Sequence, residues 1–227
     1  MAVTIEIPSE VPVMTLPNTT LFPHAVLPLY IFEPRYRTML QHVLESDRLF
    51  AVAGMNVKEA EATGRFEPPY EVATVGMVRH CRKNADETSH LVLQGLARIR
   101  FKRIISEEPY RLTEIEPLDT EPGAEDKDLR ELRANLTRLI SQNRKLGGNI
   151  PQELVEFLTQ VRDPEVFLDI AAFTLCPDHQ QKQMLLEQLN VARRYERYLE
   201  LLRRENERLI IDKKLKGGLD DDGIQMN

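Results

Sequence analysis

The amino-acid sequence predicts an α+β protein in which a compact, partly closed β-barrel or sandwich is followed by helices. Before about residue 120, apolar side chains alternate with polar ones or form short runs between turn residues, a pattern typical of strands. After that point they recur every three or four residues, as in helices that bury one face. The 227 residues allow one large domain or two modest ones.

The first half contains several short strand candidates bounded by turn residues. They cover residues 11–16, 25–31, 48–54, 71–80, 89–94, 96–105 and 110–116. Residues 96–105 give the clearest alternation, because Ile99 and its apolar neighbours fall on the opposite face from the basic residues. Ala97, Ile99 and Phe101 are expected on one face, and Arg98, Arg100 and Lys102 on the other.

One helix is expected early in this strand series. Pro34 suits the first turn of a helix because no backbone N–H is needed there. The apolar face that follows consists of Tyr36, Met39, Leu40, Val43 and Leu44.

The polar segment with Pro122 and Gly123 predicts a linker between the two halves. We therefore expect a barrel over residues 1–118, a linker over 119–124, a helical bundle over 125–215 and a disordered tail over 216–227. Within the bundle, Asp163 and Asp178 have the spacing of helix N-caps.

The last helix is expected over about residues 190–214. Its apolar seam consists of Val191, Tyr195, Tyr198, Leu202 and Leu209, and Glu205 and Asn206 interrupt it. The seam can pack on the preceding helices or on a helix of a partner chain. Its short length favours the first, because a coiled coil requires three or four clean heptads.

Composition excludes several classes of protein. The net charge of -6, from 30 Lys and Arg against 36 Asp and Glu, argues against a basic nucleic-acid-binding protein. The two cysteines, Cys81 and Cys176, have no metal-ligand spacing and predict reduced thiols in the cytoplasm. The start shows no secretory signal, and no apolar run approaches the ~20 residues that span a bilayer.

Motifs for catalysis are not found in the sequence. There is no Gly-rich phosphate loop ending in Lys-Ser or Lys-Thr, no His-Glu-x-x-His zinc motif and no Gly-x-Ser-x-Gly elbow. The pair His80-Cys81 has no second pair with which to hold a metal. We therefore predict no catalytic residue, no metal and no cofactor.

One basic patch provides an alternative function. Arg98, Arg100 and Lys102, near Arg79, Arg82 and Lys83, are the candidates for contact with RNA. Phe101 falls on the other face of the strand, whereas an RNA platform places aromatic rings beside the charges. The pattern therefore argues against nucleic acid as the main partner.

Four motifs follow one another along the chain: the opening segment 16–39, which contains Ile31-Phe-Glu-Pro-Arg-Tyr36, then Thr74-Val-Gly-Met-Val78, Leu93-Gln-Gly-Leu-Ala-Arg98 and the helical part from Asp163 to Arg204. In this order they resemble the Lon protease N-terminal (substrate-binding) domain family, and the segment from Ile31 to Tyr36 is most similar to its free-standing bacterial members. The resemblance covers roughly residues 11 to 210. The sequence departs from the family at His24, where Gly is usual, and in the longer loop 56–69.

This resemblance implies a barrel similar to the PUA fold, a helical bundle, and recognition of peptides or unfolded proteins. Candidate peptide-binding residues are Phe22, Leu29, Tyr30, Phe32 and Tyr36. No nucleotide loop or peptidase motif follows Leu215, so we expect a non-catalytic, cytoplasmic protein that can act as an adaptor for a separate ATP-dependent protease or chaperone. No membrane partner is expected.

Overall fold

The computed structural model describes residues 5–220, and their side chains as far as residue 215. The chain forms two compact units. One contains residues 1–120 together with 172–189, and the other contains residues 121–171 together with 190–227, as far as each is described. We call them the strand unit and the helical unit.

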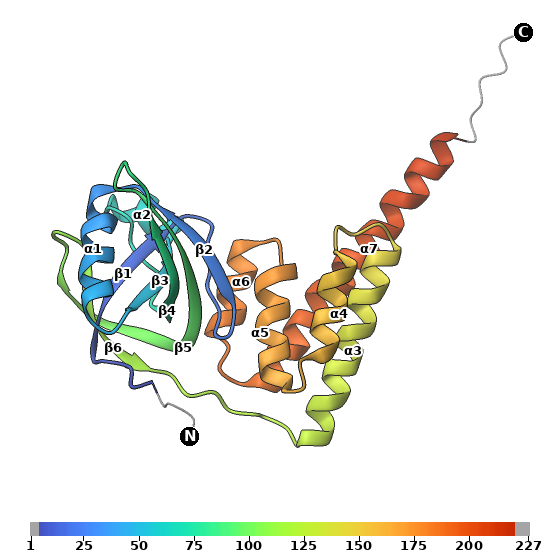
Figure 1. The fold of residues 1–227 in the computed structure, drawn as a ribbon. Helices are drawn as coiled ribbons and strands as arrows, with labels where there is room; N and C mark the ends of the chain where they lie inside the picture. The colour runs from blue at the N-terminus through green and yellow to red at the C-terminus, as the bar shows by residue number, and fades with distance from the viewer. Residues whose placement is uncertain (1–4, 221–227) are drawn as a thin grey trace, which may run out of the picture. The chain divides into compact units, whose positions relative to one another are not determined.

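The strand unit is built on one six-stranded mixed sheet that closes on itself (Figure 1). Its strands are β1 (Glu10–Leu16), β2 (Val26–Ile31), β3 (Leu49–Gly54), β4 (Val72–Lys83), β5 (Ser89–Ser106) and β6 (Leu112–Pro117). Their order is β2-β5-β4-β3-β1-β6, and β6 also pairs with β5, which closes a barrel and leaves β2 outside it. β1 and β3 run parallel, and the other pairs are antiparallel. The predicted α+β class and barrel are confirmed.

β5 joins the two predicted strands 89–94 and 96–105 into one strand of 18 residues. Its first part pairs with β2 and its last part with β6, while β4 pairs along most of its length. The register shifts beside Gly76 and Gly95, which lie opposite each other. A Cβ atom at Gly95 would lie 2.1 Å from the carbonyl oxygen of Phe22, so glycine is required for this close approach.

Three helices belong to the strand unit. The predicted helix is present as α1 (Pro34–Glu45), with Tyr36, Met39, Leu40 and Val43 buried. α2 (Val57–Thr63) lies in the segment predicted as a loop. The side chain of Asn56 accepts a hydrogen bond from the Glu59 backbone N–H, and Gly64 ends the helix at φ 67°. This Asn-x-x-Glu spacing was a usable helix signal.

The third helix, α6 (His179–Glu187), packs on the sheet, although the sequence placed it in the helical bundle. Gln183 donates from Nε2 to the carbonyl oxygen of Val72 at 2.9 Å. Arg98 donates from Nε to the carbonyl oxygen of Leu186, in the last turn of α6, at 3.0 Å. Periodicity shows that a helix buries one face, but it does not show which element covers that face.

The helical unit contains α3 (Asp126–Lys145), α4 (Gln152–Gln160), the part of α5 (Pro164–Leu175) up to Ala171, and α7 (Val191–Asp220). The predicted caps are present: Asp163 accepts from the N–H groups of Glu165 and Val166, and Asp178 accepts from that of Gln181. α7 continues to Asp220, so residues 216–220 of the predicted tail are helical, and the rest of that tail lies outside the described residues.

The seam of α7 packs within its own unit, as the sequence favoured. Tyr198 donates to the carbonyl oxygen of Ala171 at 3.2 Å. Asn206, which interrupts the apolar pattern, is buried, and its Oδ1 accepts from Nδ2 of Asn143 in α3 at 2.8 Å. The polar residue in the seam of α7 is therefore hydrogen-bonded to a polar residue of α3.

Candidate functional site

An exposed apolar strip follows β2 and the first residue after it. Val26, Tyr30 and Phe32 remain 53%, 48% and 59% exposed, which is high for large apolar side chains. The ring centroids of Tyr30 and Phe32 lie 5.8 Å apart, and those of Tyr30 and His90 lie 4.8 Å apart. We call Val26, Tyr30, Phe32 and His90 the aromatic face.

β2 is the edge strand outside the barrel, and one of its faces is exposed. Val26, Pro28 and Tyr30 alternate with Leu27 and Leu29, which are half-buried on the opposite face. Antiparallel pairing with β5 then brings His90 directly opposite Tyr30.

The predicted peptide-binding residues therefore differ in their exposure. Tyr30 and Phe32 come together on the surface, but Phe22 and Tyr36 are 0% and 5% exposed. The Tyr36 hydroxyl donates to the carbonyl oxygen of Thr15 at 3.2 Å. Burial raises the pKa of Tyr36 to about 12. Phe22 and Tyr36 are therefore packed in the interior, whereas Tyr30 and Phe32 are exposed.

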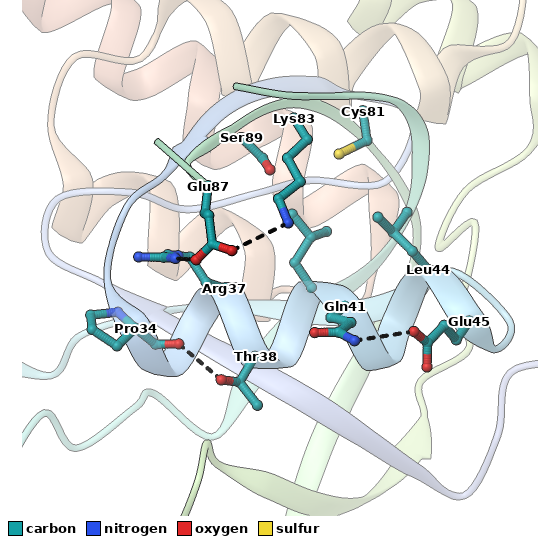
Figure 2. Close-up of a pocket in the computed structure, with 11 residues that line it drawn as sticks. Pro34, Arg37, Thr38, Gln41, Leu44, Glu45, Cys81, Lys83, Glu87 and Ser89 are labelled. Atoms are coloured by element: carbon teal, nitrogen blue, oxygen red, sulfur yellow. Dashed lines mark hydrogen bonds and ion pairs between the residues drawn. The ribbon is translucent and has the colours of Figure 1, made fainter. Parts of the chain in front are cut away.

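A groove of about 470 Å³ runs between α1 and the β4–β5 hairpin (Figure 2). Leu40 and Leu44 contribute apolar surface, and Cys81 and Ser89 line it from the strands. At its rim, Glu87 forms ion pairs with Arg37 of α1 and, at 3.9 Å, with Lys83. One carboxylate is thus shared between two cations, beside the apolar surface of the groove.

A second cavity of about 520 Å³ lies beside Tyr36 and contains a buried guanidinium. Arg111 is 9% exposed and donates to Thr15 Oγ1 at 2.7 Å, to the Glu67 carbonyl oxygen at 2.9 Å and to the Glu107 carboxylate at 2.9 Å. Arg35, at the same cavity, pairs with Glu67 at 2.8 Å. Because these cations already have partners, the cavity is a poor site for an added anion.

The residues proposed for RNA contact do not form a shared exposed stripe. Arg98 is 3% exposed beneath α6, where it bonds the Leu186 carbonyl oxygen. Arg100 and Lys102 both pair with Glu116, at 3.0 and 3.4 Å. The hydrogen bond from Arg100 lowers the pKa of the Glu116 carboxyl. The alternation predicted for this strand is correct for the buried Ile99, but the opposite face is covered at Arg98 by α6.

Among the side chains that the structure describes, residues 5–215, no three His, Cys, Asp or Glu are placed to hold a metal ion together. Cys176 is buried, and burial raises the pKa of its thiol, which opposes the reactive thiolate. Burial also lowers the pKa of Lys182, whose ammonium lies 5.4 Å from the Phe173 ring centroid. Over the same residues, no helix has both the length and the apolarity needed to cross a bilayer.

Known structures share this fold. The N-terminal domain of a Mycobacterium avium complex Lon protease aligns with a TM-score of 0.65 at 17% identity, over 87% of this chain and 98% of that one. A Lon N-terminal domain protein from Xanthomonas campestris aligns with a TM-score of 0.60 at 19% identity, over 85% of this chain and 98% of that one.

Sequence relatives lead to the same family. The Lon protease of Fervidobacterium nodosum is 31% identical over 216 residues, which are 93% of this chain and 26% of that protein. The Lon protease of Desulfosudis oleivorans is 27% identical over 96% of this chain and 27% of its own length. The chain thus spans about a quarter of these relatives. Residues 10–204 match the ATP-dependent protease La (LON) substrate-binding domain, and the chain belongs to this family.

Proposed function

We propose that this protein recognises exposed apolar segments of unfolded or partly unfolded proteins through the aromatic face, without cleaving them. The observation that carries the proposal is the placement of Val26, Tyr30 and Phe32, about half exposed, along the edge strand β2 and the residue that follows it, in a substrate-binding domain. Apolar contact lacks direction, so such a surface accepts many sequences. Aromatic side chains also contribute a large contact area for little loss of conformational entropy.

The proposal is tested by comparing an unfolded client with its native form. Reduced, carboxymethylated α-lactalbumin and the native, disulfide-bonded protein share one sequence, so fluorescence anisotropy of the two labelled forms isolates the effect of unfolding. We expect clearly tighter binding of the unfolded form, and the difference should survive moderate salt because apolar contact is not screened. Equal binding of both forms would refute the proposal.

A double variant tests whether clients bind at the aromatic face. Tyr30→Ser with Phe32→Ser removes two exposed rings, so the loss of unfolded-client affinity should reach about tenfold or more. Phe157→Ser is the matched control, because Phe157 is 50% exposed on α4 of the other unit. Similar losses in both variants would show general stickiness and would remove the aromatic face from the proposal.

The absence of catalysis is a separate part of the proposal. It is supported by the family match to the substrate-binding domain over residues 10–204, and by the buried Cys176 thiol, whose raised pKa opposes the reactive thiolate. We infer that the protein acts in the cytoplasm as an adaptor that delivers clients to a separate ATP-dependent protease or chaperone. Incubation of the purified chain with casein and ATP should give neither peptides nor ADP, and turnover that follows this protein through purification would contradict this part.

A further inference from the structure

The sheet surface beside the aromatic face carries basic side chains that lack acidic partners. Pairing across three strands forms two rows: Tyr30 of β2 lies opposite His90 of β5, which lies opposite Arg82 of β4, and Pro28, Val92 and His80 form the next row. Side chains that are directly opposite in antiparallel strands point to the same face. Each row therefore runs from an apolar side chain at the edge to a basic one about 10 Å away.

A further basic residue, Arg79, lies beside these rows. The register shifts between Val78 and His80, and the extra residue, Arg79, donates from Nε to Gln94 Oε1 at 2.7 Å. Gln94 lies opposite Val26 in β2, so Arg79 is held on the same face as the aromatic strip. Arg79, His80, Arg82 and His90 are all exposed.

Acidic residues are missing from all three strands. None of the residues of β2, β4 or β5 is Asp or Glu, although the whole chain has 36 acidic residues and a net charge of -6. Of the carboxylates near the end of β2 and the β4–β5 turn, Glu33 pairs with Arg35, Glu87 pairs with Arg37 and Lys83, and Asp86 accepts from the N–H and the hydroxyl of Thr88. Among the described residues, neither Arg79 nor Arg82 forms an ion pair. In contrast, Arg100, Lys102 and Arg103 pair with Glu116 or Glu114.

We propose that the face formed by β2, β5 and β4 binds extended peptide segments in which apolar side chains lie within a few residues of Asp or Glu. This rests on the proposed function and assigns its substrate class. The apolar side chains of the segment contact Val26, Tyr30 and Phe32, and its carboxylates contact Arg79 and Arg82. A peptide fits better than RNA, because Tyr30 already stacks on Phe32 and on His90, and Val26 and Pro28 provide no surface for a base.

The test uses three labelled peptides with Phe and Leu at the same positions. At all other variable positions, one peptide carries Glu, the second Gln and the third Lys. At about 50 mM salt, we expect the Glu peptide to bind about three- to tenfold more tightly than the Gln peptide and the Lys peptide to bind weakest, since exposed charge pairs are individually weak. Raising the salt to about 500 mM should remove most of this preference. The Gln peptide should keep its affinity.

Matched variants test which residues cause the preference for the Glu peptide. Arg79→Gln with Arg82→Gln should abolish the difference between Glu and Gln peptides, and Arg79→Glu with Arg82→Glu should reverse it in favour of the Lys peptide. Arg100→Gln with Lys102→Gln is the control with the same change of charge and should leave the preference intact. Circular dichroism checks that each variant is folded.

The outcomes separate the two proposals. If the peptides bind through Tyr30 and Phe32 with no charge preference, or if the Arg79 and Arg82 variants retain it, the substrate class is wrong while the proposed function stands. If no peptide binds, both fail. If single-stranded RNA displaces the Glu peptide and binds more tightly through Arg79 and Arg82, the face is a nucleic-acid site and the inference is overturned.

Discussion

Replacing Arg98 by Met should destabilise the strand unit, although the sequence presents Arg98 as a surface residue of a basic stripe. Arg98 is 3% exposed, its Nε donates to the Leu186 carbonyl oxygen at 3.0 Å, and its guanidinium lies 5.9 Å from the centroid of the Phe22 ring. Methionine keeps most of the apolar stem but removes the charged donor. The carbonyl in the last turn of α6 then loses its partner.

The expected magnitude follows from these contacts. A hydrogen bond to a charged group contributes about 1.5–3 kcal/mol, and a cation near an aromatic ring contributes about 0.5–2 kcal/mol. Burial of the guanidinium costs free energy in the native protein, and Met no longer bears this cost. The net loss should therefore be about 2 kcal/mol. For a chain of this length that corresponds to a fall in Tm of about 4–8 °C.

Thermal unfolding followed by far-ultraviolet circular dichroism measures this loss, with Arg100→Gln as the comparison. Arg100 is exposed and paired with Glu116 at 3.0 Å, and such surface pairs contribute about 0–1 kcal/mol. The Tm of Arg100→Gln should therefore stay close to that of the wild type. A Tm for Arg98→Met within 1 °C of wild type, where about 4–8 °C is expected, would refute the buried placement and return Arg98 to the candidates for RNA contact.

Three further predictions concern stability. Asn206→Leu leaves the buried Asn143 amide without its partner and should cost about 1–3 kcal/mol in urea unfolding, whereas changing both asparagines to Leu should recover much of this. Burial raises the pKa of Tyr36 to about 12 from an ordinary value of about 10. The stability that Tyr36 contributes is therefore complete below pH 10 and is lost as the pH rises toward 12, and Tyr36→Phe should flatten this part of the pH–stability curve. Gly95→Ala places a Cβ atom 2.1 Å from the Phe22 carbonyl oxygen and should lower the Tm by several degrees, and an unchanged Tm would show that this contact relaxes freely.

Local signals in the sequence predicted most secondary elements because those signals have local causes. Pro34 starts α1, and Asp163 and Asp178 accept the first free N–H groups of their helices. The same reasoning applied to Asn56 and Glu59 would have predicted α2. Long-range packing was not predictable in this way, because the association of α6 with the sheet depends on contacts such as that between Gln183 and Val72, far apart in sequence.

The candidate site was predictable only in part, for a related reason. Tyr30 and Phe32 belong to the segment 16–39, which can be recognised in the sequence. Alternation along a strand also predicts that neighbouring residues face opposite sides. The burial of Phe22 and the approach of His90 to Tyr30 depend on which strands pair and in which register. A strand pattern does not specify its partner, so the rows that join Tyr30 to Arg82 required the structure.

The size of the aromatic face also limits how tightly it can bind. Aromatic side chains offer about 150–250 Å² each, so the exposed parts of Val26, Tyr30 and Phe32 together present about 250–300 Å². At about 25 cal/mol per Å² this corresponds to about 6–7 kcal/mol, from which association subtracts at least about 4 kcal/mol. Contact with this face alone therefore gives millimolar or weaker binding. The three- to tenfold gain expected from Arg79 and Arg82 adds only about 1 kcal/mol. A client with several such segments is therefore needed for useful affinity, and each single segment dissociates rapidly.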